Sequence, residues 1–94
     1  MSAPPRASAR LEVKNRLGLH ARAAGLVVRT ATGFSAEVTV TKDDQCVNGK
    51  SILNLMMLAA APGTILEVTC EGADAEAALE ALTALFEARF HEDG

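Results

Sequence analysis

Segments in which polar and apolar residues alternate recur along this chain between segments of helical periodicity, and this interleaving strongly constrains the possible folds. Alternation places apolar side chains on one face of a strand, so each such segment predicts a half-buried strand. The predicted strands are residues 11–14, 34–41, 45–48 and 64–71. The acidic pair Asp43-Asp44 predicts a turn that joins the second and third strands into a hairpin.

Apolar residues at three- and four-residue spacing predict three helices, over about residues 21–31, 51–58 and about 75–90. Gly33 is placed to end the first helix, and Asp74 is a good N-cap for the last. The resulting order is β-α-β-β-α-β-α. We therefore expect an α+β protein with an open-faced β-sandwich, in which three helices cover one face of a four-stranded antiparallel sheet.

Length and composition limit the alternatives. A chain of 94 residues with 49% hydrophobic residues suits one packed domain, and no apolar segment approaches the ~18 residues typical of a membrane span. The net charge of −3, with scattered basic residues, gives no surface for a polyanion, so we expect no nucleic-acid partner and no membrane partner. The predicted organisation is a flexible leader (1–9), a domain (10–91) and a tail (92–94).

The cysteines and the N-terminal segment indicate the compartment. Cys46 and Cys70 lie in predicted strands without a CxxC motif, so free thiols are expected instead of a disulfide or a zinc site. The first ten residues, MSAPPRASAR, contain no apolar core typical of a secretory signal. We expect a cytoplasmic protein without a metal or other cofactor.

The segment NRLGLHARAAGLVVR, residues 15–29, places His20 where the first helix begins. A neutral imidazole is a competent nucleophile, and the positive end of a helix favours a dianion attached to it. Because neither His20 nor Ala21 is a usual capping residue, the N–H groups of Ala21, Arg22 and Ala23 are expected to be free for phosphoryl oxygens, with the Arg22 guanidinium as a further donor. On spacing alone, an ordinary exposed histidine beside a solvated arginine is favoured over a site.

Two motifs add to this interpretation. GLHARAAGLVVRTA closely resembles the active-site motif of the HPr family, the histidine phosphocarriers of the phosphoenolpyruvate-dependent phosphotransferase system, and NGKSILNLMML resembles that family's second conserved region. The resemblance covers residues 11–90. It implies that His20 receives a phosphoryl group on Nδ1 from enzyme I and passes it to a IIA domain, with Arg22 assisting. Ala23 stands where the family usually has proline, and we expect this to change the efficiency of transfer more than the role.

Ser51 heads the second helix, where an N-cap is its structural interpretation. The resemblance implies in addition that Ser51 is the regulatory site of an HPr kinase/phosphorylase. It also implies a partner-binding patch, which methionine suits because it adapts to several partners. The residues of that patch would be Arg22, Arg29, Ile52, Leu53 and Met56. Core packing is the alternative for this apolar segment, and it would take Ile52 together with Leu55 or Leu58.

The expected function is that of a monomeric phosphoryl carrier, a relay component more than a stand-alone enzyme. Its acceptor would be either a sugar-transport component or a nitrogen- or regulation-linked IIA protein. The alternatives are a regulatory interaction domain of the same fold, controlled by phosphorylation of Ser51 without onward transfer, and a generic small α+β binding module. Labelled phosphoenolpyruvate and enzyme I would distinguish the carrier from both, since only the carrier takes up the label.

Overall fold

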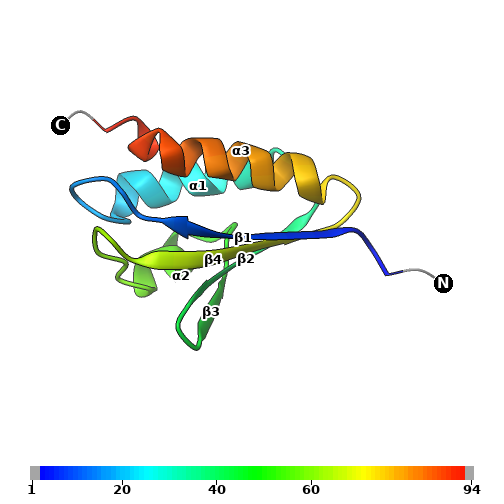
Figure 1. Ribbon diagram of the computed structural model, residues 1–94. Helices are drawn as coiled ribbons and strands as arrows, with labels where there is room; N and C mark the ends of the chain where they lie inside the picture. The colour runs from blue at the N-terminus through cyan, green and yellow to red at the C-terminus, as the bar shows by residue number, and fades with distance from the viewer. Residues whose placement is uncertain (1–2, 93–94) are drawn as a thin grey trace.

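The structure is a computed structural model that describes residues 3–92, and it contains one four-stranded antiparallel sheet with the strand order β1-β4-β2-β3 (Figure 1). The strands are β1 (Arg6–Glu12), β2 (Glu37–Lys42), β3 (Gln45–Asn48) and β4 (Ile65–Glu71). The helices are α1 (Ala21–Thr32), α2 (Ile52–Met57) and α3 (Ala75–Glu87), followed by the 3-10 turn η1 (Arg89–His91). The predicted fold class and element order are confirmed.

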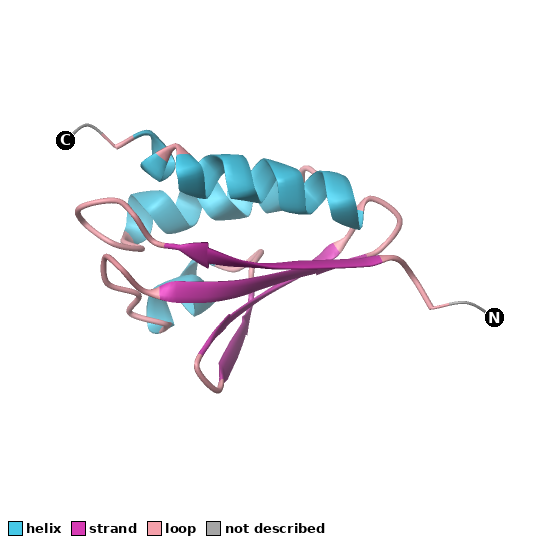
Figure 2. Ribbon diagram, in the orientation of Figure 1, coloured by secondary structure: helices cyan, strands magenta, loops and turns pink. Residues whose placement is uncertain are grey.

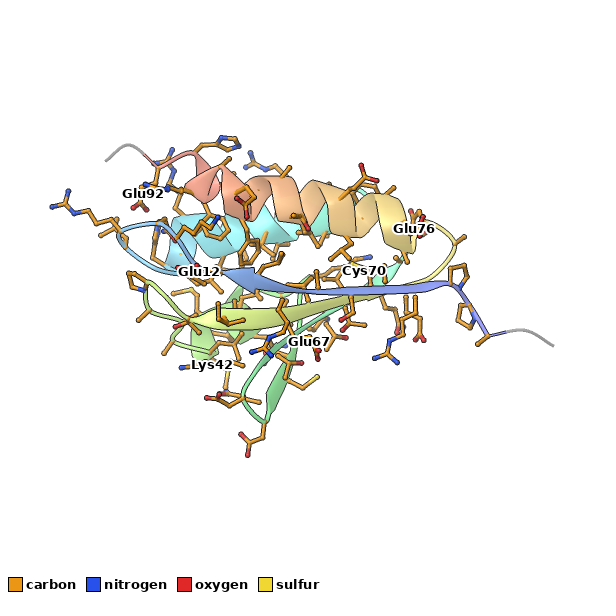
Figure 3. The ribbon with its side chains drawn as sticks, in the orientation of Figure 1. Glu12, Lys42, Glu67, Cys70, Glu76 and Glu92 are labelled. Atoms are coloured by element: carbon orange, nitrogen blue, oxygen red, sulfur yellow. The ribbon has the colours of Figure 1, made fainter. Side chains whose placement is uncertain are left out.

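The helices form one layer and the sheet forms the other. In Figure 2, α1 and α3 lie side by side over the sheet, and α2 packs against α1 and β3. Cys70 on β4 points into the interface between the layers, whereas Glu67 of the same strand lies on the opposite, solvent-facing side (Figure 3). This alternation is the period of two that the sequence predicted for the strand.

The first strand is longer than predicted. It was expected over residues 11–14, but β1 covers Arg6–Glu12, and each of its residues has a partner on β4. Residues 6–9, assigned to the leader, therefore belong to the sheet, while residues 1–2 lie outside the described part. The sequence signal was weak because the inward positions Ala7 and Ala9 are small and only half-buried. Val13 continues the pairing through bonds to the backbone of residues 63 and 64.

The hairpin follows the prediction closely. Lys42 pairs with Gln45, so Asp43 and Asp44 form a two-residue turn, and Asp43 adopts a positive φ of 55°. Aspartate tolerates this left-handed conformation better than most residues do. The other strand and helix boundaries agree with the prediction or differ from it by at most three residues, and the largest difference in the hairpin is that β2 begins at Glu37 instead of residue 34. The cysteines are both free, with Cys46 exposed on β3.

Helix α1 ends at Gly33 as predicted, although this glycine has a right-handed φ of −72° and its N–H bonds to Thr30 and Ala31 carbonyls. The buried face of the helix includes Ala24 and Val27, while Val28 is half-buried. The glycine therefore closes the helix without needing the left-handed conformation.

Asp74 occupies the N-cap position of α3, but its carboxylate makes no capping bond. It accepts hydrogen bonds from the backbone N–H groups of Ser35 and Ala36, both at 2.8 Å, and so fixes the segment before β2 to the start of α3. Those bonds, led by the one from Ser35, lower the pKa of Asp74. The carboxylate prefers this tertiary contact to the local cap that the sequence predicted.

The last helix is shorter than the predicted 75–90. It ends at Glu87, and the following residues Arg89, Phe90 and His91 have positive φ angles of 54°, 54° and 57°. This left-handed turn buries Phe90, whose ring packs edge-on against Phe86 at a centroid distance of 4.8 Å. No helix within residues 3–92 is long and apolar enough to span a membrane.

Candidate functional site

His20 lies at the N-cap of α1 in an extended backbone conformation, with φ −79° and ψ −179°. The preceding loop is fixed to the loop after α2, because the N–H of Leu19 donates to the carbonyl of Ala60 at 2.9 Å. Gly18 has a φ of +70°, and a Cβ built there would lie 2.6 Å from the same Ala60 oxygen. Only glycine fits at this close approach without strain. The contact between the two loops thereby determines the position of His20 at the start of α1.

The imidazole of His20 caps the helix itself. Its Nδ1 accepts a hydrogen bond from the N–H of Arg22 at 3.2 Å. The expectation that the first turn has no side-chain acceptor is therefore wrong, since an imidazole nitrogen does what a serine or aspartate oxygen does elsewhere. The side chain is 29% exposed, so it is partly buried, and not the freely exposed loop side chain expected from the sequence.

The opposite ring nitrogen contacts a carboxylate that the sequence analysis missed. The Nε2 of His20 lies 3.2 Å from Oε2 of Glu92, a residue assigned to the tail (92–94). Glu92 also accepts hydrogen bonds from the Asn15 side chain at 3.0 Å and from the N–H of Leu17 at 3.1 Å. Residues 93–94 lie outside the described part. No local sequence signal could have found a contact between residues 72 positions apart.

The rest of the first turn has two backbone donors without a partner among the described residues, in Ala21, which is exposed, and in Ala23, which is buried. The backbone N–H groups of Ala21 and Ala23 make no hydrogen bond within residues 3–92, and the Arg22 side chain is exposed. Together with the Arg22 N–H these are the three donors the sequence predicted. Unpaired N–H groups at the positive end of a helix attract a phosphate or carboxylate.

Ala23→Pro is expected to raise the free energy of unfolding by about 0.4–1 kcal/mol, because proline restricts the unfolded chain and gives up an N–H that has no intrahelical partner. The matched control is Ala24→Pro, where the N–H donates to the His20 carbonyl at 2.8 Å and the loss should be about 3 kcal/mol or more. Urea denaturation measures both. Destabilisation by Ala23→Pro would show that the buried Ala23 side chain has no room for the ring.

Ser51 is the N-cap of α2, and its Oγ accepts a hydrogen bond from the N–H of Asn54 at 3.2 Å. The residues that follow divide between core and surface. Leu55 and Leu58 are buried, whereas Ile52, expected in the core by the packing alternative, is 44% exposed. A helix of six residues has only one narrow buried face, and Leu55 occupies it.

An apolar surface therefore remains on α2, next to α1. Its exposed residues are Ile52, Leu53, Met56 and Met57, of which Met57 was not predicted. A Cβ at Gly25 of α1 would touch the Ile52 side chain at 4.0 Å, so the two helices meet there. Arg22 and Arg29 lie three residues before and four residues after Gly25, on the same side of α1. We call the predicted five residues, Arg22, Arg29, Ile52, Leu53 and Met56, the α1–α2 patch.

The arrangement joins an imidazole nitrogen, which can act as a nucleophile, to a helix N-terminus, which can bind an anion. Nδ1 carries its lone pair toward the first turn, where a phosphoryl oxygen would meet backbone donors. Within residues 3–92 no group of three or more His, Cys, Asp or Glu side chains could hold a metal ion. The fold and the site thus define a small α+β protein with a histidine at the N-terminus of a helix, the class to which histidine phosphocarriers belong.

Comparisons with known proteins identify the family. The family model "PTS HPr component phosphorylation site" matches residues 7–88. The phosphocarrier protein HPr of Neisseria meningitidis serogroup A is 54% identical over 82 residues, which covers 87% of this chain and 92% of that protein. The crystal structure of HPr-C-His from Thermoanaerobacter tengcongensis is similar with a TM-score of 0.90 at 42% identity, covering 94% of this chain and 99% of that chain. The crystal structure of an HPr dimer from the same organism is similar with a TM-score of 0.75 at 45% identity, covering 87% of this chain and 94% of that chain.

This chain belongs to the HPr family of phosphocarriers of the phosphotransferase system.

Proposed function

We propose that the protein accepts a phosphoryl group on Nδ1 of His20 from enzyme I and passes it to a IIA domain. The observation that carries this proposal is the position of Nδ1, which points to the N–H of Arg22 at the start of α1. An unprotonated Nδ1 can attack phosphorus directly. As the N–P bond forms, the bond to the donor breaks and its electron pair leaves with the donor.

The first turn of α1 would stabilise the transferred group. The N–H of Arg22 would donate to a phosphoryl oxygen instead of to the ring nitrogen, and the free N–H groups of Ala21 and Ala23 would donate to the other phosphoryl oxygens. The exposed guanidinium of Arg22 supplies a planar pair of donors that matches phosphate oxygens. His20 and Arg22 are thus the proposed catalytic residues, and no cofactor takes part in this scheme.

Labelling tests the proposal. The purified protein is incubated with enzyme I and labelled phosphoenolpyruvate, and it should take up about one label per chain that is stable in base and lost in acid. Addition of a IIA domain should then remove the label. No uptake would contradict the carrier function and favour the alternative of a regulatory interaction domain, whereas label that the IIA domain does not remove would contradict onward transfer.

The α1–α2 patch is the proposed docking surface for enzyme I and for the IIA acceptor. Exposed leucine, isoleucine and methionine side chains give up water favourably on association, and Arg22 and Arg29 beside them can pair with acidic groups of a partner. Because successive partners would use the same patch, it must stay free between encounters. We therefore propose that the carrier works as a monomer in the cytoplasm, without a nucleic-acid or membrane partner.

Ser51 is the proposed site of regulation by an HPr kinase/phosphorylase. Its hydroxyl lies at the start of α2, directly before Ile52 and Leu53 of the patch. A phosphate is compatible with a helix N-terminus, so the helix would remain while the docking surface gained two negative charges.

Ser51→Asp is expected to weaken docking to enzyme I while the fold stays intact, because aspartate is a good N-cap but its charge must lose water when a partner covers the patch. Ser51→Asn is the matched control, since asparagine caps equally well without a charge. Titration calorimetry with enzyme I should show an affinity loss of about fivefold or more for the aspartate variant only. Equal affinities for all three proteins would contradict the regulatory role.

A further inference from the structure

The chain takes an unusual path to bring Glu92 to His20. Three consecutive residues without a glycine among them, Arg89, Phe90 and His91, adopt left-handed φ angles. Such conformations cost about 1–3 kcal/mol each and persist only where the surrounding structure holds them. Here the buried Phe90 ring holds the turn against Phe86. Figure 3 shows the result, with Glu92 beside the loop that joins β1 to α1.

The Glu92 carboxylate is held in place by two donors that do not titrate. Oε1 accepts from the N–H of Leu17, and Oε2 accepts from the side chain of Asn15, itself only 1% exposed. Asn15 is fixed in turn by a 2.7 Å bond to the carbonyl of Gly18. The bond from Asn15, followed by those from Leu17 and His20, lowers the pKa of Glu92, so the group is a carboxylate at neutral pH.

The two contacts of the imidazole demand one tautomer. A carboxylate can only accept, so Nε2 must carry the hydrogen that it donates to Glu92. The N–H of Arg22 can only donate, so Nδ1 must carry the lone pair. We propose that Glu92 is a positioning residue that holds His20 as the Nε2–H tautomer and so presents Nδ1 as the nucleophile. The link to phosphoryl transfer rests on the proposed function.

The same carboxylate would compensate the charge that forms on the ring. When Nδ1 attacks phosphorus, the N–P bond forms without loss of the Nε2 proton, and the imidazole ring becomes cationic. Glu92, 3.2 Å from Nε2, faces that positive charge. When the N–P bond breaks in the next transfer, the electron pair returns to Nδ1 and the ring is neutral again. No proton has to enter or leave the site.

The tautomer can be measured without any transfer, by nitrogen NMR of the imidazole in the unphosphorylated protein at alkaline pH. The wild-type protein should show a protonated Nε2 and a lone-pair Nδ1. In Glu92→Ala the ratio of the Nδ1–H to the Nε2–H tautomer should rise about tenfold, the effect of losing one charged hydrogen bond. Glu92→Gln should lie between the two, because its amide oxygen can still accept.

The matched control is Glu87→Ala, which removes a nearby carboxylate that pairs with Lys14 on the surface instead of with His20. It should leave the tautomer ratio unchanged. An unchanged ratio in Glu92→Ala, with the amide spectrum otherwise native, would overturn the positioning role. Phosphoryl acceptance should fall in Glu92→Ala, recover in part in Glu92→Gln, and remain normal in Glu87→Ala. Failure of the wild-type protein to accept label would contradict the proposed function and leave the tautomer result standing.

Discussion

His20→Ala is expected to abolish phosphoryl acceptance from enzyme I and phosphoenolpyruvate while the protein remains folded. Alanine offers no nucleophile, so the loss should be complete within the sensitivity of labelling. Folding should survive because the core lies between the sheet and the helices, and His20 is outside it. The variant does lose the cap on the Arg22 N–H, so we expect the free energy of unfolding to fall by about 1 kcal/mol.

Two further variants separate the chemistry from the cap. His20→Asn keeps a side-chain oxygen that can cap α1 but has no nucleophilic nitrogen, so it should be as inactive as His20→Ala and more stable. His91→Ala removes the other histidine, which is exposed in the turn after α3, and should be labelled normally. Circular dichroism measures the fold and stability of each variant, and labelling measures its phosphoryl acceptance. Label on a folded His20→Asn protein would show that another residue accepts the phosphoryl group.

The elements that the sequence predicted well are those whose pattern is local. The hairpin depends on alternation and a two-residue acidic turn, and β3 has the predicted boundaries of residues 45–48. Helix α1 depends on the spacing of small apolar residues, and it begins at Ala21 as predicted. In both cases the residues that decide the structure lie within one turn or one strand pair of each other.

The features that were missed depend on distant parts of the chain. The length of β1 follows from the length of β4, its partner, because the small inward residues of β1 give little signal of their own. The contact of Glu92 with His20 depends on a left-handed turn that no glycine marks. The cap on α1 was missed because the usual rule considers oxygen acceptors, whereas here the acceptor is the same imidazole nitrogen that is the proposed nucleophile.

Gly18→Ala is expected to destabilise the protein strongly and to slow phosphoryl acceptance. A left-handed φ of +70° costs a residue with a Cβ about 1–2 kcal/mol. The new Cβ would also lie 2.6 Å from the Ala60 carbonyl oxygen, so the backbone must shift, at a further cost of about 1–3 kcal/mol. That shift weakens the bond from the N–H of Leu19 to the same oxygen and displaces His20 from the start of α1.

Gly63→Ala separates the cost of the left-handed backbone from the cost of the close approach to Ala60. Gly63 also has a positive φ, +89°, but a Cβ there would meet no atom within 4 Å, so this variant carries only the backbone cost of about 1–2 kcal/mol. Urea denaturation of both variants should show the larger loss for Gly18→Ala, and labelling should be slowed in that variant alone. Equal losses of stability with normal labelling in both would mean that the close approach to Ala60 does not fix the position of His20. The difference between the two variants thus measures how strongly the loop after α2 determines the geometry of the histidine site.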